Sequence, residues 1–188
     1  MYNNDFDLAL KDYFRLTGMP PMIPRYALGN WWSRDLPYTD EEIRGLVNSF
    51  EKRGIPLSIL LLDKKWHIPQ SEDKKMLDTG YTFNKDLISD PSKLINELHE
   101  KNIHVGVQYD PKDGIYPHEE HYPEIAEMFG VADKKVIAFD PFNSALLDVI
   151  SKKLLSPLRD LGVDFFWNDY KETGQGLGEL WAINRFLL

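Results

Sequence analysis

The sequence lacks cysteine altogether, so neither a disulfide nor a thiolate metal site can form. It also lacks any uninterrupted apolar run of about 18 residues, the length a membrane-spanning helix needs. The first residues, MYNNDFDLAL, have neither the basic start nor the apolar run of a signal peptide. We therefore expect no membrane partner and a cytoplasmic location.

Basic residues are the minority charge, with 22 Lys and Arg against 30 Asp and Glu and a net charge of −8. No basic stripe is present to neutralise phosphates, which argues against a nucleic-acid partner. Histidines 99, 104, 118 and 121 show no ligand spacing that repeats on one element, so we predict no metal site. No glycine-rich phosphate-binding pattern follows a predicted strand, and we expect no cofactor.

What the sequence does contain is an alternation of strand-like and helix-like segments within 188 residues, a length that suits one domain. Strands are expected at 26–33, 57–63, 103–109 and 163–169, and 64–89 reads as a polar loop. Helices are expected after residues 39 and 90, at 144–161, and from 180 to the end. This order predicts an α/β fold with parallel strands and right-handed crossovers. Periodicity alone leaves two architectures open, a doubly wound open sheet and part of a barrel.

Local signals support the helices. Thr39 with Glu42 three residues later is a capping-box pattern, and Gly54 is placed to end that helix. Asp90 is the expected cap of the next helix, with Pro91 in its first turn. In 144–161 the inward stripe is predicted at residues 147, 150, 154, 158 and 161, and the proline at 157 should kink or split the helix.

The carboxyl ends of the predicted strands carry carboxylates and large aromatic residues. The first ends in Asn30-Trp31-Trp32-Ser33-Arg34, the second in Asp63 followed by Trp66 and His67, the third in Gln108-Tyr109-Asp110, and the fourth in residues 167–172. Reacting groups collect at these ends in parallel α/β folds. Aromatic faces cover the C–H patches of sugars, and carboxylates accept bonds from sugar hydroxyls, so a carbohydrate partner is predicted.

Five stretches carry a resemblance to glycoside hydrolase family 31, the α-glucosidases, α-xylosidases and relatives. They are LTGMPPMIPRYALGNWWSR at 16–34, IPLSILLLD at 55–63, GYTFN at 80–84, DGIYPHEE at 113–120 and VDFFWNDYKE at 163–172. The resemblance implies parallel βαβ units forming the first half, about four strands, of a TIM (β/α)8 barrel. One domain is expected over 1–188, with a lead-in segment at 1–25 and the four strands and their helices at 26–188.

The family's nucleophile motif reads Trp-x-Asp-Met-(Asn/Ser/Ala)-Glu, and Trp167, Asp169 and Glu172 occupy its fixed positions. The resemblance therefore implies that Asp169 is the nucleophile of a retaining α-glycosidase acting on α-linked glucosides or related sugars. Glu172 would support the nucleophile loop. The implied substrate-binding residues are Asp63, Trp66, His67, Trp167, Trp31 and Trp32.

Two departures from the family pattern stand out. Lys65 occupies the position where the family usually has an Asp that accepts hydrogen bonds from sugar hydroxyls. The family's acid/base carboxylate follows the sixth strand, and four strands are predicted here. The chain is thus expected to be a fragment that has the nucleophile and lacks the acid/base, with possible self-association or pairing with the other half-barrel.

Two alternatives stay open on the residues. One is a non-catalytic carbohydrate-binding or interaction module derived from the same barrel, which Lys65 favours. The other is an unrelated flavodoxin-like α/β enzyme, which a doubly wound open sheet would establish. Tryptophans are often buried whatever the function, so Trp31, Trp32 and Trp66 also have a purely structural interpretation.

Overall fold

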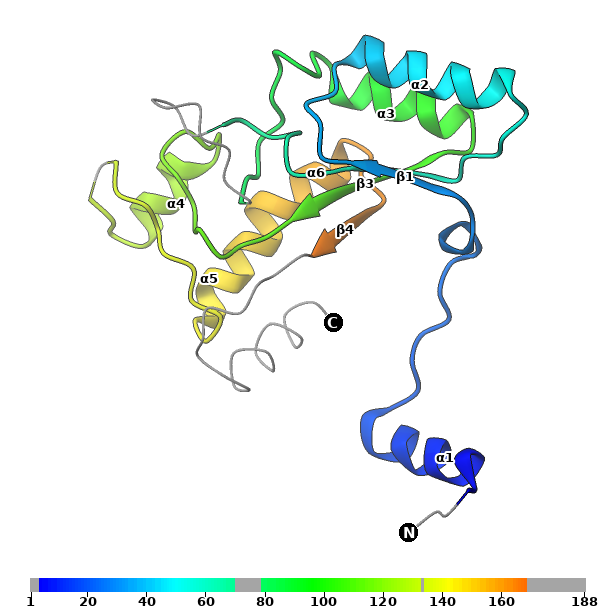
Figure 1. Cartoon of the computed structure of the whole chain (residues 1–188). Helices are drawn as coiled ribbons and strands as arrows, with labels where there is room; N and C mark the ends of the chain where they lie inside the picture. The colour runs from blue at the N-terminus through cyan, green and yellow to red at the C-terminus, as the bar shows by residue number, and fades with distance from the viewer. Residues whose placement is uncertain (1–3, 70–78, 133, 169–188) are drawn as a thin grey trace.

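The computed structural model of the chain describes residues 4–69, 79–132 and 134–168. Its centre is a parallel sheet of four strands, β1 (Trp31–Arg34), β2 (Ile59–Leu62), β3 (His104–Tyr109) and β4 (Phe165–Asn168) (Figure 1). The strands pair in the order β1-β2-β3-β4. A strand order that follows the chain without reversal is that of successive barrel units, whereas a doubly wound sheet reverses its order at a switch point. The flavodoxin-like alternative is therefore wrong.

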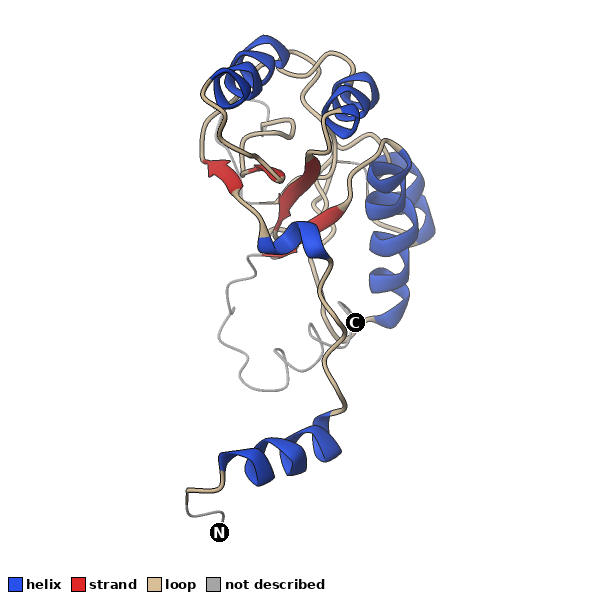
Figure 2. Cartoon of the chain, turned by 90° about the vertical axis from the view of Figure 1, so that its right-hand side faces the viewer, coloured by secondary structure: helices blue, strands red, loops and turns tan. Residues whose placement is uncertain are grey.

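The helices α2 (Asp40–Lys52) and α3 (Pro91–Glu100) pack on one side of the sheet, and the helical segment that precedes β4 lies on the same outer side (Figure 2). Leu60 and Val105 are examples of the strand residues that pack beneath them, against Ile43 and Leu94. Strands buried in this way read as nearly continuous apolar runs, which is why 57–63 and 103–109 were recognisable from the sequence.

The predicted caps of α2 and α3 are confirmed. The Thr39 hydroxyl accepts a hydrogen bond from the backbone N–H of Glu42, while the Glu42 carboxylate accepts one from the N–H of Thr39. Gly54 follows the helix with φ +63°. The Asp90 side chain caps α3 by accepting from the Lys93 N–H at 3.0 Å. These bonds satisfy amides that the first helical turn leaves unpaired.

The predicted helix at 144–161 is divided, as its proline indicated. It consists of α5 (Ser144–Val149), a π-helical stretch η2 (Ile150–Leu155) and α6 (Ser156–Asp160). Proline has no N–H to donate to the preceding turn, and the wider π turn lies directly before Pro157. The extra residue in that turn shifts the inward stripe, so the buried positions are Leu146, Val149, Ile150, Leu154, Leu155 and Leu158.

The beginning of the chain differs from expectation. Residues 25–28 form a 3₁₀ turn, η1 (Arg25–Leu28), and the first strand starts only at Trp31. The turn closes through a bond from the Gly29 N–H to the Tyr26 carbonyl, which ends extended structure there. The lead-in also contains a helix the sequence did not reveal, α1 (Phe6–Thr17), which has no buried residue and lies apart from the sheet (Figure 1).

Two further segments needed the structure. The short helix α4 (Tyr122–Met128) was not predicted, and it buries Ile125. The loop expected at 64–89 supplies core residues as well as polar ones, among them Phe83 and Ile88. The last predicted helix, at 180–188, lies outside the described residues.

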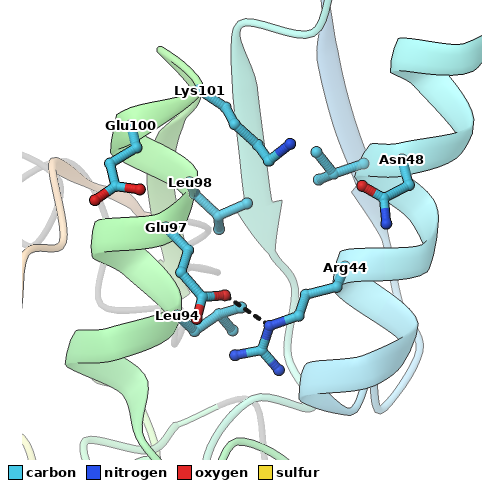
Figure 3. A pocket seen from close by; sticks show the side chains of 8 residues that line it. Arg44, Asn48, Leu94, Glu97, Leu98, Glu100 and Lys101 are labelled. Carbon is cyan, nitrogen blue, oxygen red and sulfur yellow. Dashed lines mark hydrogen bonds and ion pairs between the residues drawn. The ribbon is translucent and has the colours of Figure 1, made fainter.

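A shallow groove runs between α2 and α3 on the outer surface (Figure 3). Its volume is about 280 Å³, and Leu94 and Leu98 line it. The Arg44 Nε donates to the Glu97 carboxylate at 2.6 Å and ties the two helices together. None of the helices in the described ranges is long and apolar enough to cross a bilayer.

Candidate active site

The parallel strands bring their carboxyl ends to one edge of the sheet, and the side chains there divide between two faces. Leu62 and Val107 pack toward the helices. Their neighbours along each strand therefore point to the opposite side, which we call the inner face. Gly106 fits this assignment, because the ring of Phe165 on β4 covers the space where a Cβ would lie. The inner face at the carboxyl edge is the candidate site.

Asp63 follows β2 directly and, by the same alternation, belongs to the inner face. One carboxylate oxygen accepts the backbone N–H of Lys64 at 2.8 Å. The other faces the hydroxyl of Ser33 at the end of β1, at 3.4 Å. Asp63 thus has the position expected of a sugar-binding carboxylate. Its contact with a sugar stays a prediction.

An aromatic group lies on the inner face. It joins Trp31, which is the first residue of β1 and not at the carboxyl end of its strand as predicted, to Phe165 and Trp167 of β4. The ring of Trp31 lies 5.4 Å from that of Phe165 and 5.9 Å from that of Trp167, both in edge-on geometry. The Trp31 indole is held by a bond to the Ala27 carbonyl at 3.0 Å. Trp167 remains 48% exposed. An accessible indole braced by a second one is a surface suited to the C–H face of a pyranose.

Trp66 lies in the core instead, and Trp32 is partly buried and packs against that core. Trp32 follows Trp31 in the strand and so faces the helices, where it packs edge-on against Phe50 of α2 at 5.6 Å. Trp66 is 3% exposed, packs on Phe83, and donates its indole N–H to the Gln108 carbonyl at 3.0 Å. Both indoles therefore have a structural role. Their predicted sugar contacts gain no support from these positions.

His67 is also buried. Its Nδ1 lies 3.1 Å from the Ile68 carbonyl, and its ring rests directly on Gly80, where a Cβ would collide with it. His67 and Phe83 form an isolated antiparallel bridge that closes the loop after β2. The histidine fixes this loop, and its predicted contact with a sugar hydroxyl stays a prediction.

Lys65 points toward the loop after β1. Its Nζ lies 3.4 Å from the Asp35 carbonyl and 3.7 Å from the Asp35 carboxylate. The lysine therefore pairs with an acidic residue of its own chain at the rim. The predicted nucleophile Asp169 and its supporting residue Glu172 lie outside the described residues, immediately beyond the last residue of β4.

Two polar residues without a predicted role, Gln108 and Asp110, lie at the carboxyl end of β3. Gln108 is 3% exposed, and Asp110 is fully buried. Burial raises the pKa of the Asp110 carboxyl, against the opposing effect of the Lys112 N–H at 3.0 Å and the Lys112 ammonium at 3.4 Å. Their position at a strand's carboxyl end could have marked these two residues as candidate site residues. The sequence pattern could not predict that both side chains are buried.

Glu119 is the second buried carboxyl group near this edge. Its oxygens accept the Tyr81 N–H at 3.1 and 3.2 Å and the Thr82 hydroxyl at 2.6 Å. Burial raises the pKa of Glu119 to about 7, although these bonds oppose the rise. The nearby His118 has its pKa lowered by burial, so it offers no full charge to offset the carboxylate near neutral pH. Glu119 joins the loop after β2 to the loop after β3.

Successive parallel βα units, with Asp63 and Trp167 on the inner face at the carboxyl edge, define a segment of a (β/α)8-barrel enzyme. The family model of the glycosyl hydrolases family 31 TIM-barrel domain matches residues 20–181. The chain belongs to glycoside hydrolase family 31, and the fold expected from the resemblance is confirmed.

The curated relatives include an α-xylosidase of Saccharolobus solfataricus, 26% identical over 178 residues that cover 95% of this chain and 23% of the relative. An α-glucosidase 2 of Bacillus thermoamyloliquefaciens is 28% identical over 179 residues, covering 87% of this chain and 21% of the relative. The chain thus spans less than a quarter of the length of these two relatives.

Solved structures share the fold. A family 31 α-xylosidase from Xanthomonas citri superposes with a TM-score of 0.67 at 21% identity, over 87% of this chain and 18% of that one. A family 31 α-xylosidase from a soil metagenome, complexed with xylose, superposes with a TM-score of 0.63 at 24% identity. The match covers 81% of this chain and 23% of that one. At these identities the likeness to the solved structures shows a shared fold.

Proposed function

We propose that this chain forms the first half of the catalytic barrel of a retaining α-glycosidase that hydrolyses α-linked glucosides or xylosides, with Asp169 as the nucleophile. One observation carries the proposal. Trp167, the first residue of the family's nucleophile motif, lies on the inner face at the end of β4, braced by Trp31. The names of the two curated relatives support the choice of sugars.

In this mechanism the Asp169 carboxylate attacks the anomeric carbon as the bond to the leaving oxygen breaks, and a glycosyl ester forms. A carboxylic acid protonates the leaving oxygen, and water then opens the ester. Retaining enzymes hold the two carboxyl groups about 5–5.5 Å apart. We assign the second group to a part of the barrel beyond these 188 residues. Asp63 and Trp167 would bind the reacting sugar, with Glu172 supporting the nucleophile loop.

The test uses the full-length protein that contains this chain, with p-nitrophenyl α-glucoside and α-xyloside as substrates. Asp169→Ala should lower kcat at least about 10⁴-fold, because the attacking group is lost. Asp86→Ala, which replaces an exposed aspartate in the loop between β2 and α3, is the matched control and should retain activity. Added azide should restore turnover of Asp169→Ala by attacking from the vacated face and should give the β-glycosyl azide. Hydrolysis by Asp169→Ala at the wild-type rate would refute the assignment.

A second candidate, a non-catalytic carbohydrate-binding module, is favoured by Lys65. A cation at this position cannot accept hydroxyl hydrogen bonds, and here it pairs with Asp35. Sugar binding without turnover in the full-length protein, unchanged in Asp169→Ala, would establish the module in place of the enzyme.

A further inference from the structure

Gln108 occupies the middle of a row of inner-face residues at the carboxyl edge. It pairs in register with Trp167 on β4. On the other side, Leu62 pairs with Val107, so the next residue along each strand places Asp63 beside Gln108. In a parallel sheet, residues in register share a face. The amide of Gln108 is therefore flanked by a carboxylate and by a partly exposed indole.

The Gln108 amide is buried and unpaired. The residue is 3% exposed, and within the described residues neither its nitrogen nor its oxygen has a hydrogen-bond partner. A primary amide can donate two hydrogen bonds and accept two. Leaving such a group buried without partners costs about 1–3 kcal/mol, so its retention at this position calls for a partner other than the described residues.

The backbone of Gln108 is fixed, while its side-chain amide has no hydrogen-bond partner among the described residues. The Trp66 indole donates to the Gln108 carbonyl at 3.0 Å from the helix side of the sheet. This bond anchors the strand where it ends, so the amide is presented from a rigid element. A ligand that satisfies the amide must donate and accept together, and it must offer an apolar patch to Trp167. A pyranose does both, since each hydroxyl donates and accepts while the ring C–H groups cover the indole.

From this geometry we propose that Gln108 is a specificity-determining residue that hydrogen-bonds a hydroxyl of the reacting sugar, in a row with Asp63 and Trp167. The inference rests on the proposed glycosidase function and goes beyond it by assigning a hydroxyl contact to a residue of β3. Substrates that keep this hydroxyl are favoured, because an analogue without it leaves the buried amide unpaired again.

The experiment compares wild type, Gln108→Leu and the control Asn48→Leu, an exposed amide on α2, in the full-length protein. Each is assayed on p-nitrophenyl α-glucoside, on its monodeoxy analogues and on the α-xyloside. Gln108→Leu should lower kcat/KM about 10- to 100-fold relative to wild type on the parent glycoside. On the analogue that lacks the contacted hydroxyl, Gln108→Leu and wild type should have the same kcat/KM. Urea unfolding should find Gln108→Leu at least as stable as wild type, since the Gln108 amide makes no hydrogen bond to the described residues.

A uniform loss across all the analogues, or a loss of stability in Gln108→Leu, would overturn the proposal, because either result gives Gln108 a structural role. If the wild-type protein hydrolyses none of these glycosides, the proposed function is refuted instead. In that case the same variants are compared by calorimetric binding of glucose, xylose and the deoxyglucoses. If Gln108→Leu binds the sugars more weakly than wild type, but binds one deoxy sugar as well as wild type does, the hydroxyl contact is supported. An equal loss of affinity for every sugar rejects the contact.

Discussion

At the scale of single residues, the chain holds a carboxyl group where burial and hydrogen bonding compete. Glu119 receives the Tyr81 amide and the Thr82 hydroxyl, which favour its charged form, yet burial is the larger influence and raises its pKa to about 7. The folded protein therefore binds this proton more tightly than the unfolded chain does. Relative to the unfolded chain, the folded state is therefore more stable when Glu119 is protonated.

Glu119→Gln should consequently remove a pH dependence of stability. In wild type the contribution of Glu119 is fully present below about pH 4.5 and is lost as the pH rises to about 7, a change on the order of 3 kcal/mol. A glutamine does not titrate, so the difference in urea-unfolding free energy between wild type and variant should drift across this window. Glu120→Gln, at the exposed neighbouring carboxyl, should track wild type. Parallel curves for wild type and Glu119→Gln would contradict the assignment.

The residue scale also shows how far the sequence could predict the site. The rule that polar groups gather at strand ends placed Asp63 and Trp167 on the correct edge, because it depends only on strand direction. It could not separate Trp31 from Trp32, since consecutive residues of a strand face opposite sides and the predicted strand began five residues too early. Trp66 follows β2 in a loop, and loop conformation has no periodic signal.

At the scale of elements, helix ends were predicted better from local side-chain chemistry than the orientation of strand and loop residues was from periodicity. The caps at Thr39 and Asp90 were predictable because a side-chain oxygen three residues before its target amide is a local arrangement. The division of the helix predicted at 144–161 was predictable because Pro157 has no backbone N–H to donate. The shifted stripe of η2 was not predictable, because a π turn changes the register of every residue after it.

Thr39→Ala should lower the free energy of unfolding by about 1 kcal/mol, since it removes the oxygen that accepts the Glu42 amide. Thr39→Ser keeps that oxygen and should recover most of the loss. Urea denaturation of the three proteins measures the difference, and the slope with urea should stay constant because the cap changes little buried surface. An equal loss in both variants would assign the effect to packing of the Thr39 methyl group rather than to the cap.

At the scale of the whole molecule, the described strands form an open sheet with two unpaired edges. β1 and β4 each have one neighbour. A hollow of about 390 Å³ lies along β4, lined partly by Leu155, Arg159 and Phe166. The inner face leaves Trp167 accessible at 48%, and α1 presents an unburied apolar stripe that includes Phe6 and Leu16. Unpaired parallel edges and exposed apolar surface favour association with another chain.

We therefore expect the isolated 188-residue chain to self-associate. Sedimentation velocity over a hundredfold range of protein concentration should show a rising weight-average mass. Two variants locate the contact. Trp167→Lys places a charge on the inner face and should weaken association if the sheet is the contact, whereas deletion of residues 1–18 should weaken it if α1 is. Association lost only in the first variant would place the contact on the face that a complete barrel encloses. A monodisperse monomer that unfolds in one sharp transition would instead show that a four-stranded sheet with open edges is part of a sufficient folding unit.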